Sequence, residues 1–462
     1  MTEKVSILLY DDEKAKAVRR FNDGRSPKYL IRTYGCQMNE HDSEGLAGML
    51  EEMGYSPAEN VQGTSLVLFN TCCVREHAEL KAYSNVGALK KLKEENPGLI
   101  ICVCGCMMQQ EGAAEKLMKR FPFVDIAFGT HNSHLFPGML YRLLLKGERV
   151  CDMAAPAQDI IENAPARRAG PPCAWVTIMY GCDNFCSYCV VPYVRGRERS
   201  RQPEDIIAEI NRLVGEGYKE VTLLGQNVNS YGKDITGADF PALLRRINDE
   251  TGICRIRFMT SHPKDLSDGL ISAMRDCKRV CRQIHLPVQS GSSAVLARMN
   301  RHYTREDYLA LVEKLRSAMP DIGLSTDIIV GFPGETEKDF EDTMDMVQKI
   351  RFDSAYTFIY SKRSGTAAEN MEGQVPAGVK KERIRRLIEA QAAITYEKNL
   401  GCAGKAYEVL AEAVSRRGVS MLCGRNGAGM ITNFAAPPEL IGEFIEVKII
   451  GANRYTLLGE II

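Results

Sequence analysis

The sequence predicts an α/β protein with three parts: an N-terminal open parallel α/β domain, a central partial (β/α)6 barrel and a small C-terminal antiparallel β-barrel. Through the first two parts, short apolar runs alternate with helical patterns, as in parallel sheets covered by helices. Over roughly the last 60 residues, β-type runs alternate with Gly, Pro and Asn instead. The expected boundaries are 1–28 for a polar lead-in, 29–149 for the first domain, 150–172 for a proline-rich linker, 173–398 for the partial barrel and 399–462 for the β-barrel.

The composition is typical of a soluble globular protein, because 45% of the 462 residues are hydrophobic and 26% are charged. The formal net charge is zero, so any nucleic-acid surface must be local. The chain has no run of about 18 apolar residues and no signal-peptide pattern at its start, so we expect no membrane span. We expect a cytoplasmic protein, in which the 16 cysteines stay reduced and serve as cluster ligands or as small buried apolar residues.

The first domain is expected to follow a flexible lead-in. Its predicted strands cover residues 29–34, 65–70, 99–104 and 125–128. The intervening segments have helical patterns. One of these helices should run from about residue 40 to Glu52, and a long one should end near Glu95, before Asn96-Pro97-Gly98.

A cysteine lies just past three of these strand ends, at Cys36, Cys72 and Cys106. Ligands of an open parallel sheet lie beyond the carboxyl ends of its strands, so three thiols at this edge predict a metal or cluster site. The alternative is three unrelated buried thiols. The residues alone do not distinguish Cys72 from Cys73, or Cys106 from Cys104.

The second domain begins with a strand, residues 174–179, that leads directly into the C-x3-C-x2-C triplet of Cys182, Cys186 and Cys189. Three thiolates this close can hold a four-iron cluster and leave one iron open for a cofactor or substrate. Further strands are predicted over 220–224, 254–259, 283–288, 324–330 and 355–360. Six βα units indicate an open, partial barrel with its active site at the carboxyl ends of the strands.

The C-terminal region is predicted to form a charged helix over 379–400, followed by five short strands. Small β-barrels often bind single-stranded nucleic acid. Residues 401–462 carry six basic and six acidic side chains, so no basic surface stands out there.

Longer motifs accompany these cysteines. They read Thr33-Tyr34-Gly35-Cys36-Gln37-Met38-Asn39, Asn70-Thr71-Cys72, Gly105-Cys106, His285-Leu286-Pro287-Val288-Gln289-Ser290-Gly291-Ser292 and Asp327-Ile328-Ile329-Val330-Gly331-Phe332-Pro333-Gly334-Glu335. With the triplet, they make the chain resemble the radical S-adenosylmethionine (SAM) methylthiotransferases from about residue 29 to the C-terminus. The stretches 72–76, 190–197 and 225–231 are most similar to the tRNA 2-methylthio-N6-isopentenyladenosine synthases (MiaB-type).

The resemblance implies two ligand sets: Cys36, Cys72 and Cys106 for an auxiliary [4Fe–4S] cluster, and Cys182, Cys186 and Cys189 for the radical SAM [4Fe–4S] cluster. Cys73 departs from the family pattern, which usually has a non-ligating residue there. The resemblance also implies a TRAM-like C-terminal barrel. The implied reaction uses two SAM molecules and adds a methylthio group to carbon 2 of N6-isopentenyladenosine at position 37 of tRNA. A radical route is needed because an aromatic C–H bond has no useful acidity at neutral pH.

The remaining site candidates depend on position and family analogy. Expected cofactor-binding residues are Gln289, Ser290, Asp327 and Glu335, with local capping or turn formation as the alternative. Expected substrate-binding residues are Gln226, Asn227, Asn229, Arg195 and Arg197, with a polar loop and a solvated charged face as the alternatives.

The expected partners are the tRNA anticodon stem-loop and a flavodoxin- or ferredoxin-like reductant, and we expect a monomer that does not bind membranes. Two alternative functions stay open. One is a methylthiotransferase acting on threonylcarbamoyl-adenosine in tRNA or on a ribosomal protein aspartate. The other is a non-catalytic, cluster-containing RNA-binding protein.

Overall fold

The computed structural model describes residues 12–73, 76–153, 160, 162, 165–416, 418 and 420–462. The chain divides into two compact units, and each is considered by itself. The first comprises the described residues up to Ala169 with the segments Tyr180–Asp183 and Val190–Arg201. The second comprises Gly170–Met179, Asn184–Cys189 and the described part of Gln202–Ile462.

The first unit is built on a six-stranded parallel sheet in the order β2-β1-β3-β4-β5-β6. Its strands are β1 (Lys28–Thr33), β2 (Ser56–Pro57), β3 (Leu66–Thr71), β4 (Ile100–Gly105), β5 (Ile126–Phe128) and β6 (Val150–Asp152). β3 and β4 are buried along their whole length, which explains their continuous apolar runs.

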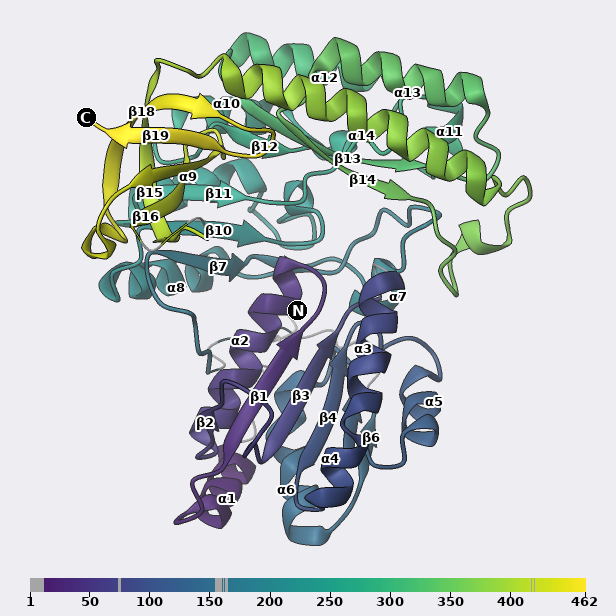
Figure 1. The fold of residues 1–462 in the computed structure, drawn as a ribbon, viewed down its shortest axis with the longest axis vertical. Coiled ribbons are helices and arrows are strands. Elements are labelled where there is room, and N and C mark those ends of the chain that lie inside the picture. Colours follow the sequence, from purple (N-terminus) through teal and green to yellow (C-terminus); the bar gives the residue numbers. More distant parts are fainter. Residues whose placement is uncertain are drawn as a thin grey trace. The chain divides into compact units, whose positions relative to one another are not determined.

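Helices cover both faces of this sheet (Figure 1). They are α1 (Asp12–Asn22), α2 (Gln37–Glu52), α3 (Glu76–Ala88), α4 (Lys90–Glu95), α5 (Ala113–Arg120), η1 (Ser133–Leu135), α6 (Phe136–Lys146) and the short α7 (Val191–Arg195). One core lies under α1, α2 and α6, and includes Val18, Leu46 and Leu140. A second core lies under α3 and α5, and includes Val86 and Leu117.

Three expectations for this unit were wrong. The lead-in contains α1, because Ala15 and Val18 lie one turn apart and are buried within an otherwise charged segment. The long helix expected to end near Glu95 divides at Leu89, whose N–H bonds to Val86 O in a tight turn. Residues Val150–Asp152, assigned to the linker, pair with β5 and form the last strand of the sheet.

The second unit contains the expected six parallel strands in two three-stranded sheets, β11-β10-β7 and β12-β13-β14. They are β7 (Cys173–Thr177), β10 (Glu220–Leu224), β11 (Arg255–Phe258), β12 (Gln283–His285), β13 (Gly323–Val330) and β14 (Ser354–Ile359). The remaining strands of this region, β8 (Met179–Tyr180) and β9 (Arg199–Ser200), pair with each other. The partial barrel is confirmed.

Helices connect these strands. They are α8 (Pro203–Gly215), η2 (Val228–Ser230), α9 (Phe240–Glu250), η3 (Pro263–Asp265), α10 (Asp268–Asp276), α11 (Ser293–Arg298), α12 (Arg305–Ala318), α13 (Glu337–Ile350), η4 (Ala367–Asn370) and α14 (Ala377–Leu400). Capping boxes begin α12 at Thr304 and α13 at Thr336. Among the described residues, no helix has both the length and the apolar character needed to cross a membrane.

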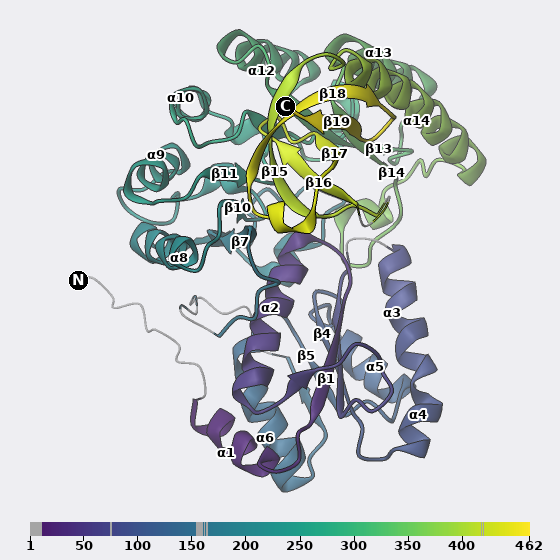
Figure 2. The same ribbon diagram turned by 60° about the vertical axis from the view of Figure 1, so that its left-hand side comes forward.

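The C-terminal strands close into a barrel in the order β15-β16-β17-β19-β18 (Figure 2). They are β15 (Ala406–Val414), β16 (Met421–Asn426), β17 (Ile431–Ala435), β18 (Phe444–Ala452) and β19 (Leu457–Ile461), with η5 (Pro438–Leu440) before β18. Val409, Leu422 and Phe434 fill its interior. The pairs are antiparallel, as expected, except for the parallel pair of β17 and β19.

Candidate active site

The strand-end cysteines of the first unit follow β1, β3 and β4, whose carboxyl ends share one edge of the sheet. Gly35, just before Cys36, has a φ of +115°. A Cβ on Gly35 would lie 2.5 Å from Cys72 Cβ and 2.7 Å from Cys72 Sγ. A glycine at this position therefore lets the end of β1 close against Cys72.

Two buried asparagines tie the loops after β1 and β3 together. Asn39 Nδ2 donates to Tyr34 O at 2.8 Å and to Thr71 O at 3.0 Å. Asn70 Nδ2 in turn donates to Asn39 O at 2.8 Å. Hydrogen bonds buried in this way fix the backbone that carries the cysteines.

Arg195 binds the third cysteine of the set. Its Nε donates to Cys106 Sγ at 3.2 Å, and its Nη2 donates to Asn39 Oδ1 at 2.8 Å and to Asp42 Oδ2 at 2.6 Å. Only 6% of Arg195 is exposed. The structure therefore contradicts both a solvated face and a substrate contact for Arg195, because Asp42 and the thiol already occupy its guanidinium.

The surroundings of Cys106 favour its thiolate, which is the metal-ligating form. A hydrogen bond from Cys73 is the largest cause that lowers the pKa of Cys106, and the Arg195 charge adds to it. Cys104, by contrast, packs into the core under α1, α2 and α6, where burial raises its pKa. This contrast favours Cys106 over Cys104 as a ligand. Position does not distinguish Cys72 from Cys73 as a ligand, because each lies near another part of this cysteine set. Cys72 lies against Gly35, and Cys73 lies against Cys106.

The triplet loop is divided between the two units, with Tyr180–Asp183 in the first and Asn184–Cys189 in the second. In the first unit, Cys182 N–H bonds to Gly196 O at 3.2 Å. Gly181 has a φ of +77°, and a Cβ there would overlap Arg197 O. Arg197 itself is exposed and lies 3.5 Å from Asp183.

In the second unit, Cys186 is buried beside Arg301, whose Nη1 lies 3.5 Å from Cys186 Sγ. Arg301 Nη2 also donates to Pro287 O at 2.8 Å. Phe185 has a φ of +43°, and Asn300 Nδ2 holds its carbonyl oxygen at 2.9 Å. Backbone strain of this kind persists where the surroundings impose it, often at functional sites.

Among the described residues, several buried polar atoms without a hydrogen-bond partner lie in the segments that follow β10, β11 and β12. They are Gln226 Oε1, Asn227 Oδ1, Asn229 Oδ1, Ser261 Oγ, His262 Nε2 and Gln289 Oε1. An unsatisfied buried polar group costs about 1–3 kcal/mol. A polar ligand at the carboxyl ends of these strands would satisfy them, so this set fits a nucleoside-like cofactor or substrate.

The other expected cofactor residues lie in different settings. Ser290 Oγ accepts from Ser292 N at 3.2 Å, which is the local turn alternative. Asp327 is partly exposed, 3.5 Å from His285 Nε2. Glu335 contradicts our expectation, because its Oε1 accepts from Arg383 Nη1 at 2.7 Å and from Gly331 N at 2.9 Å. Its buried carboxylate therefore holds α14 to the turn and is not free for a cofactor.

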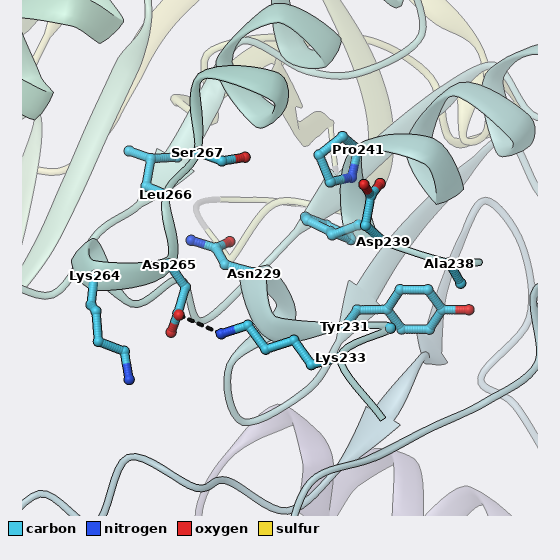
Figure 3. Close-up of a pocket in the computed structure, with 12 residues that line it drawn as sticks. Asn229, Tyr231, Lys233, Ala238, Asp239, Pro241, Lys264, Asp265, Leu266 and Ser267 are labelled. Carbon is cyan, nitrogen blue, oxygen red and sulfur yellow. Dashed lines mark hydrogen bonds and ion pairs between the residues drawn. The ribbon is translucent and has the colours of Figure 1, made fainter. Parts of the chain in front are cut away.

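A cavity of about 300 Å³ opens next to the loops after β10 and β11 (Figure 3). Asp265 on its wall bonds to Lys233 Nζ at 2.6 Å and to Asn227 Nδ2 at 2.7 Å. Lys264 Nζ reaches Asn184 Oδ1 in the triplet loop at 2.7 Å. The lining contains two lysines, Lys233 and Lys264, and two aspartates, Asp239 and Asp265.

Sequence reasoning missed Asn39, Asp42 and Arg301. Asn39 belongs to the motif that contains Cys36. A side-chain amide in the first turn of a helix, however, has no sequence pattern that reveals its hydrogen-bond partners. Arg301 lies 115 residues from Cys186 along the chain, so no local pattern connected them.

Family comparisons divide the chain into the same three parts. Residues 28–129 match the family described as "Uncharacterized protein family UPF0004", residues 176–347 match the Radical SAM superfamily, and residues 402–462 match the TRAM domain.

Solved structures with a similar fold include the radical SAM methyltransferase TsrM of Kitasatospora setae, determined with cobalamin and a [4Fe–4S] cluster. Its TM-score is 0.53 at 16% identity, over 74% of each chain. The cobalamin-dependent radical SAM enzyme OxsB has a TM-score of 0.52 at 12% identity, over 80% of this chain and 58% of that one. At these identities the likeness shows the fold alone.

Much more similar sequences are tRNA-2-methylthio-N(6)-dimethylallyladenosine synthases. The protein of Clostridium perfringens is 54% identical over 94% of this chain and 97% of its own length. That of Caldicellulosiruptor saccharolyticus is 55% identical over 98% and 97%. The chain therefore belongs to the tRNA-2-methylthio-N(6)-dimethylallyladenosine synthase family of radical SAM enzymes.

Proposed function

We propose that this protein adds a methylthio group to carbon 2 of N6-isopentenyladenosine (N6-dimethylallyladenosine) at position 37 of tRNA. The observation that carries the proposal is the identity of 54–55% to synthases of this name over nearly the whole chain. The three-part architecture supports it, because each part matches its own family. SAM and two [4Fe–4S] clusters are the cofactors of this proposal.

The donor sets fit two such clusters. Cys36, Cys72 and Cys106 follow neighbouring strand ends, and Cys182, Cys186 and Cys189 lie within one loop. Each set offers three thiolates, so each leaves one iron without a protein ligand. When bound, the clusters and SAM supply the radical chemistry that an unactivated aromatic C–H bond requires.

The protein's own residues position these groups. Arg195 and Arg301 each donate to a cysteine sulfur and hold it in place, at Cys106 and Cys186 respectively. We assign SAM binding to Gln289, which follows β12, and to Asp327, which lies within β13. Ser290 is left out of this assignment, because its Oγ accepts from Ser292 N in a local turn. Two observations on the described residues support this assignment. Gln289 Oε1 is buried without a hydrogen-bond partner, and the Asp327 side chain is partly exposed.

We assign the adenosine and its neighbouring phosphates to the loop after β10. Gln226, Asn227 and Asn229 each have a buried amide oxygen without a partner, suited to base edges or ribose. Lys264 at the nearby cavity, whose bonding partner Asn184 is neutral, is proposed to contact phosphate. A substrate contact by the exposed Arg197 of the first unit stays a separate prediction. In this proposal the C-terminal barrel binds the anticodon stem-loop.

Mass spectrometry of tRNA nucleosides tests the proposal. A deletion strain should lack 2-methylthio-isopentenyladenosine and accumulate isopentenyladenosine, and a plasmid copy of the wild-type gene should restore the product. A variant with Cys186→Ala should not restore it. Unchanged 2-methylthio-isopentenyladenosine in the deletion strain would refute the assignment, and loss of 2-methylthio-threonylcarbamoyl-adenosine or of ribosomal aspartate methylthiolation would point to those substrates instead.

The remaining expectations stay predictions. We propose a flavodoxin- or ferredoxin-like reductant, because the reaction consumes electrons. We also propose a monomer in the cytoplasm, where thiols stay reduced. Light scattering of the reconstituted protein measures its mass in solution, and reduction assays with purified flavodoxin or ferredoxin measure electron supply.

A further inference from the structure

A group of three potential metal ligands lies at the amino ends of β7 and β10 in the second unit. The buried polar atoms described above follow the opposite, carboxyl ends of the barrel strands. Cys173 is the first residue of β7 and Glu220 is the first residue of β10, whereas Glu412 belongs to β15. One ligand atom of each residue lies within 4.8 Å of the others. The proposed reaction uses none of these residues.

The strand register explains how the three side chains meet. Glu220 and Cys173 are partners in the parallel pair of β10 and β7, so they face the same side of the sheet. Glu412 lies where the register between β15 and β16 shifts, between Ala411 and Ala413. An irregularity of this kind redirects a side chain out of the regular strand alternation.

Each carboxylate has one oxygen paired with an arginine and one oxygen without a partner among the described residues. The Glu220 side chain is 3% exposed, and its Oε1 lies 2.9 Å from Arg257 Nε, whereas no described residue binds its Oε2. Glu412 Oε2 accepts from Arg425 Nη1 at 2.6 Å, and its Oε1 likewise has no partner in the described part of the chain. In metal sites, neighbouring groups orient ligands in this way by binding the atom that does not face the metal.

We propose that Cys173, Glu220 and Glu412 bind one zinc ion, with water as the fourth ligand. Zinc accepts both sulfur and carboxylate oxygen, whereas magnesium and calcium prefer oxygen alone. Cys173 releases its proton to solvent as the zinc–sulfur bond forms. Tetrahedral zinc places its ligands roughly 3.5 Å apart, so the three groups close in by about 1 Å on binding.

The place of the site in the fold indicates a structural role. It lies at the amino ends of barrel strands, where residues serve stability and not catalysis. Around it, the C-terminal barrel is held by Arg255, whose Nη2 lies 2.7 Å from Glu408 Oε1, and by Arg257 Nη2, which donates to Asn426 O at 2.8 Å. Figure 1 shows β15 and β16 beside the starts of β7 and β10. The zinc would join the C-terminal barrel to the partial barrel, whether or not the proposed reaction is correct.

Metal analysis of the holoenzyme tests this inference. The protein is reconstituted anaerobically to about eight irons per chain, so that the cluster cysteines are occupied, then incubated with equimolar Zn²⁺ and desalted. We expect about one zinc per chain in the wild type. Cys173→Ser and Glu412→Gln should each lower zinc at least about tenfold with iron unchanged, because each removes one of three protein ligands.

Cys254→Ser is the matched control, since Cys254 is an exposed cysteine just before β11 and should retain the zinc. X-ray absorption at the zinc edge should show one sulfur at about 2.3 Å and oxygens at about 2.0–2.2 Å. A wild-type holoenzyme with less than about 0.2 zinc per chain would overturn the inference. So would zinc that persists in both variants, or zinc surrounded by three or four sulfurs. None of these readouts depends on tRNA modification.

Discussion

The two cysteine sets have the same motif of a buried arginine on a cysteine sulfur, but they differ in how the arginine charge is balanced. Arg195 donates to Cys106 and forms an ion pair with Asp42 at 2.6 Å. Arg301 donates to Cys186, and its other contacts in the described part of the chain are neutral oxygens, with no carboxylate. The positive charge of Arg195, beside the first set, is therefore neutralised by Asp42. The positive charge of Arg301, beside the second set, is not neutralised by a carboxylate of the described residues.

This difference suits the two proposed tasks. A compensated arginine holds Cys106 while changing the local potential little. An uncompensated arginine buried next to Cys186 attracts negative groups, such as a cluster with thiolate ligands or the carboxylate of SAM. Similar arginine–sulfur contacts thus produce different electrostatic fields when the other partner of the arginine is a carboxylate in one case and a neutral oxygen in the other.

The largest expected effect comes from removing one cysteine of each set. Cys186→Ala should abolish reductive SAM cleavage and methylthio transfer, whereas Cys36→Ala should abolish methylthio transfer but leave SAM cleavage measurable. Each variant should bind about four irons in place of about eight, because each set holds one cluster. Iron analysis and assays for SAM cleavage and modified tRNA measure these outcomes.

Cys104→Ala is the matched control, because Cys104 is buried in β4 two residues from Cys106 and packs in the core. The Cys104→Ala variant should still bind about eight irons. Cys72→Ala and Cys73→Ala then decide between the adjacent thiols, and we expect the larger iron loss from Cys72→Ala. Loss of SAM cleavage in Cys36→Ala would show that the two sets are assigned the wrong way round.

The next effect concerns the arginines themselves. Arg195→Met leaves Asp42 without its partner in a largely buried place and should cost about 3 kcal/mol of the free energy of unfolding. Arg301→Met leaves no carboxylate behind and should cost less. Denaturant unfolding measures both, and Arg195→Met/Asp42→Asn should recover part of the first loss. Equal losses for the two single variants, with no recovery in the double variant, would remove the distinction between the two settings.

The sequence was sufficient to predict most of the fold. The two cysteine sets stay predictions. Cys182, Cys186 and Cys189 lie within eight residues, so their spacing alone predicts a cluster. The strand patterns also placed Cys36 and Cys106 at one sheet edge. Buried charges could not be predicted, because their partners are distant along the chain.

Arg195 illustrates this limit, since Asp42 and Asn39 lie 153 and 156 residues before it. A run of arginines next to a cysteine triplet reads as a surface for phosphate, and only the folded sheet shows that the first of them is buried. Glu335 is similar, because Arg383 lies 48 residues after it.

A smaller effect should follow from the close approach of β1 to Cys72. Gly35→Ala adds a Cβ that overlaps Cys72 at a φ of +115° and should cost about 2–3 kcal/mol, with lower iron retention by the first set. Gly24→Ala is the control, because Gly24 has a φ of +76° with open space around it, and strain alone should cost about 1 kcal/mol. Similar losses for both variants, measured by denaturant unfolding, would show that packing against Cys72 is unimportant.

The smallest effect concerns His262, a buried histidine of the second unit near Arg301. Burial is the main cause that lowers the pKa of His262 to about 2, and Arg301 and Lys264 add to it. His262 is therefore neutral in the folded protein, whereas the unfolded chain takes up a proton below pH of about 6.5. Its contribution to stability is complete above that pH and falls as the pH decreases.

Between pH 7.5 and 5.5 this linkage should cost about 1.4 kcal/mol. His262→Gln should lose that much less than the wild type over the same range, because glutamine does not titrate. His302→Gln, at an exposed position, is the control and should behave like the wild type. Arg301→Met should leave most of the dependence in place, since burial is the larger cause. If the wild type and His262→Gln showed the same change in unfolding free energy from pH 7.5 to 5.5, His262 would not be held neutral in the folded protein.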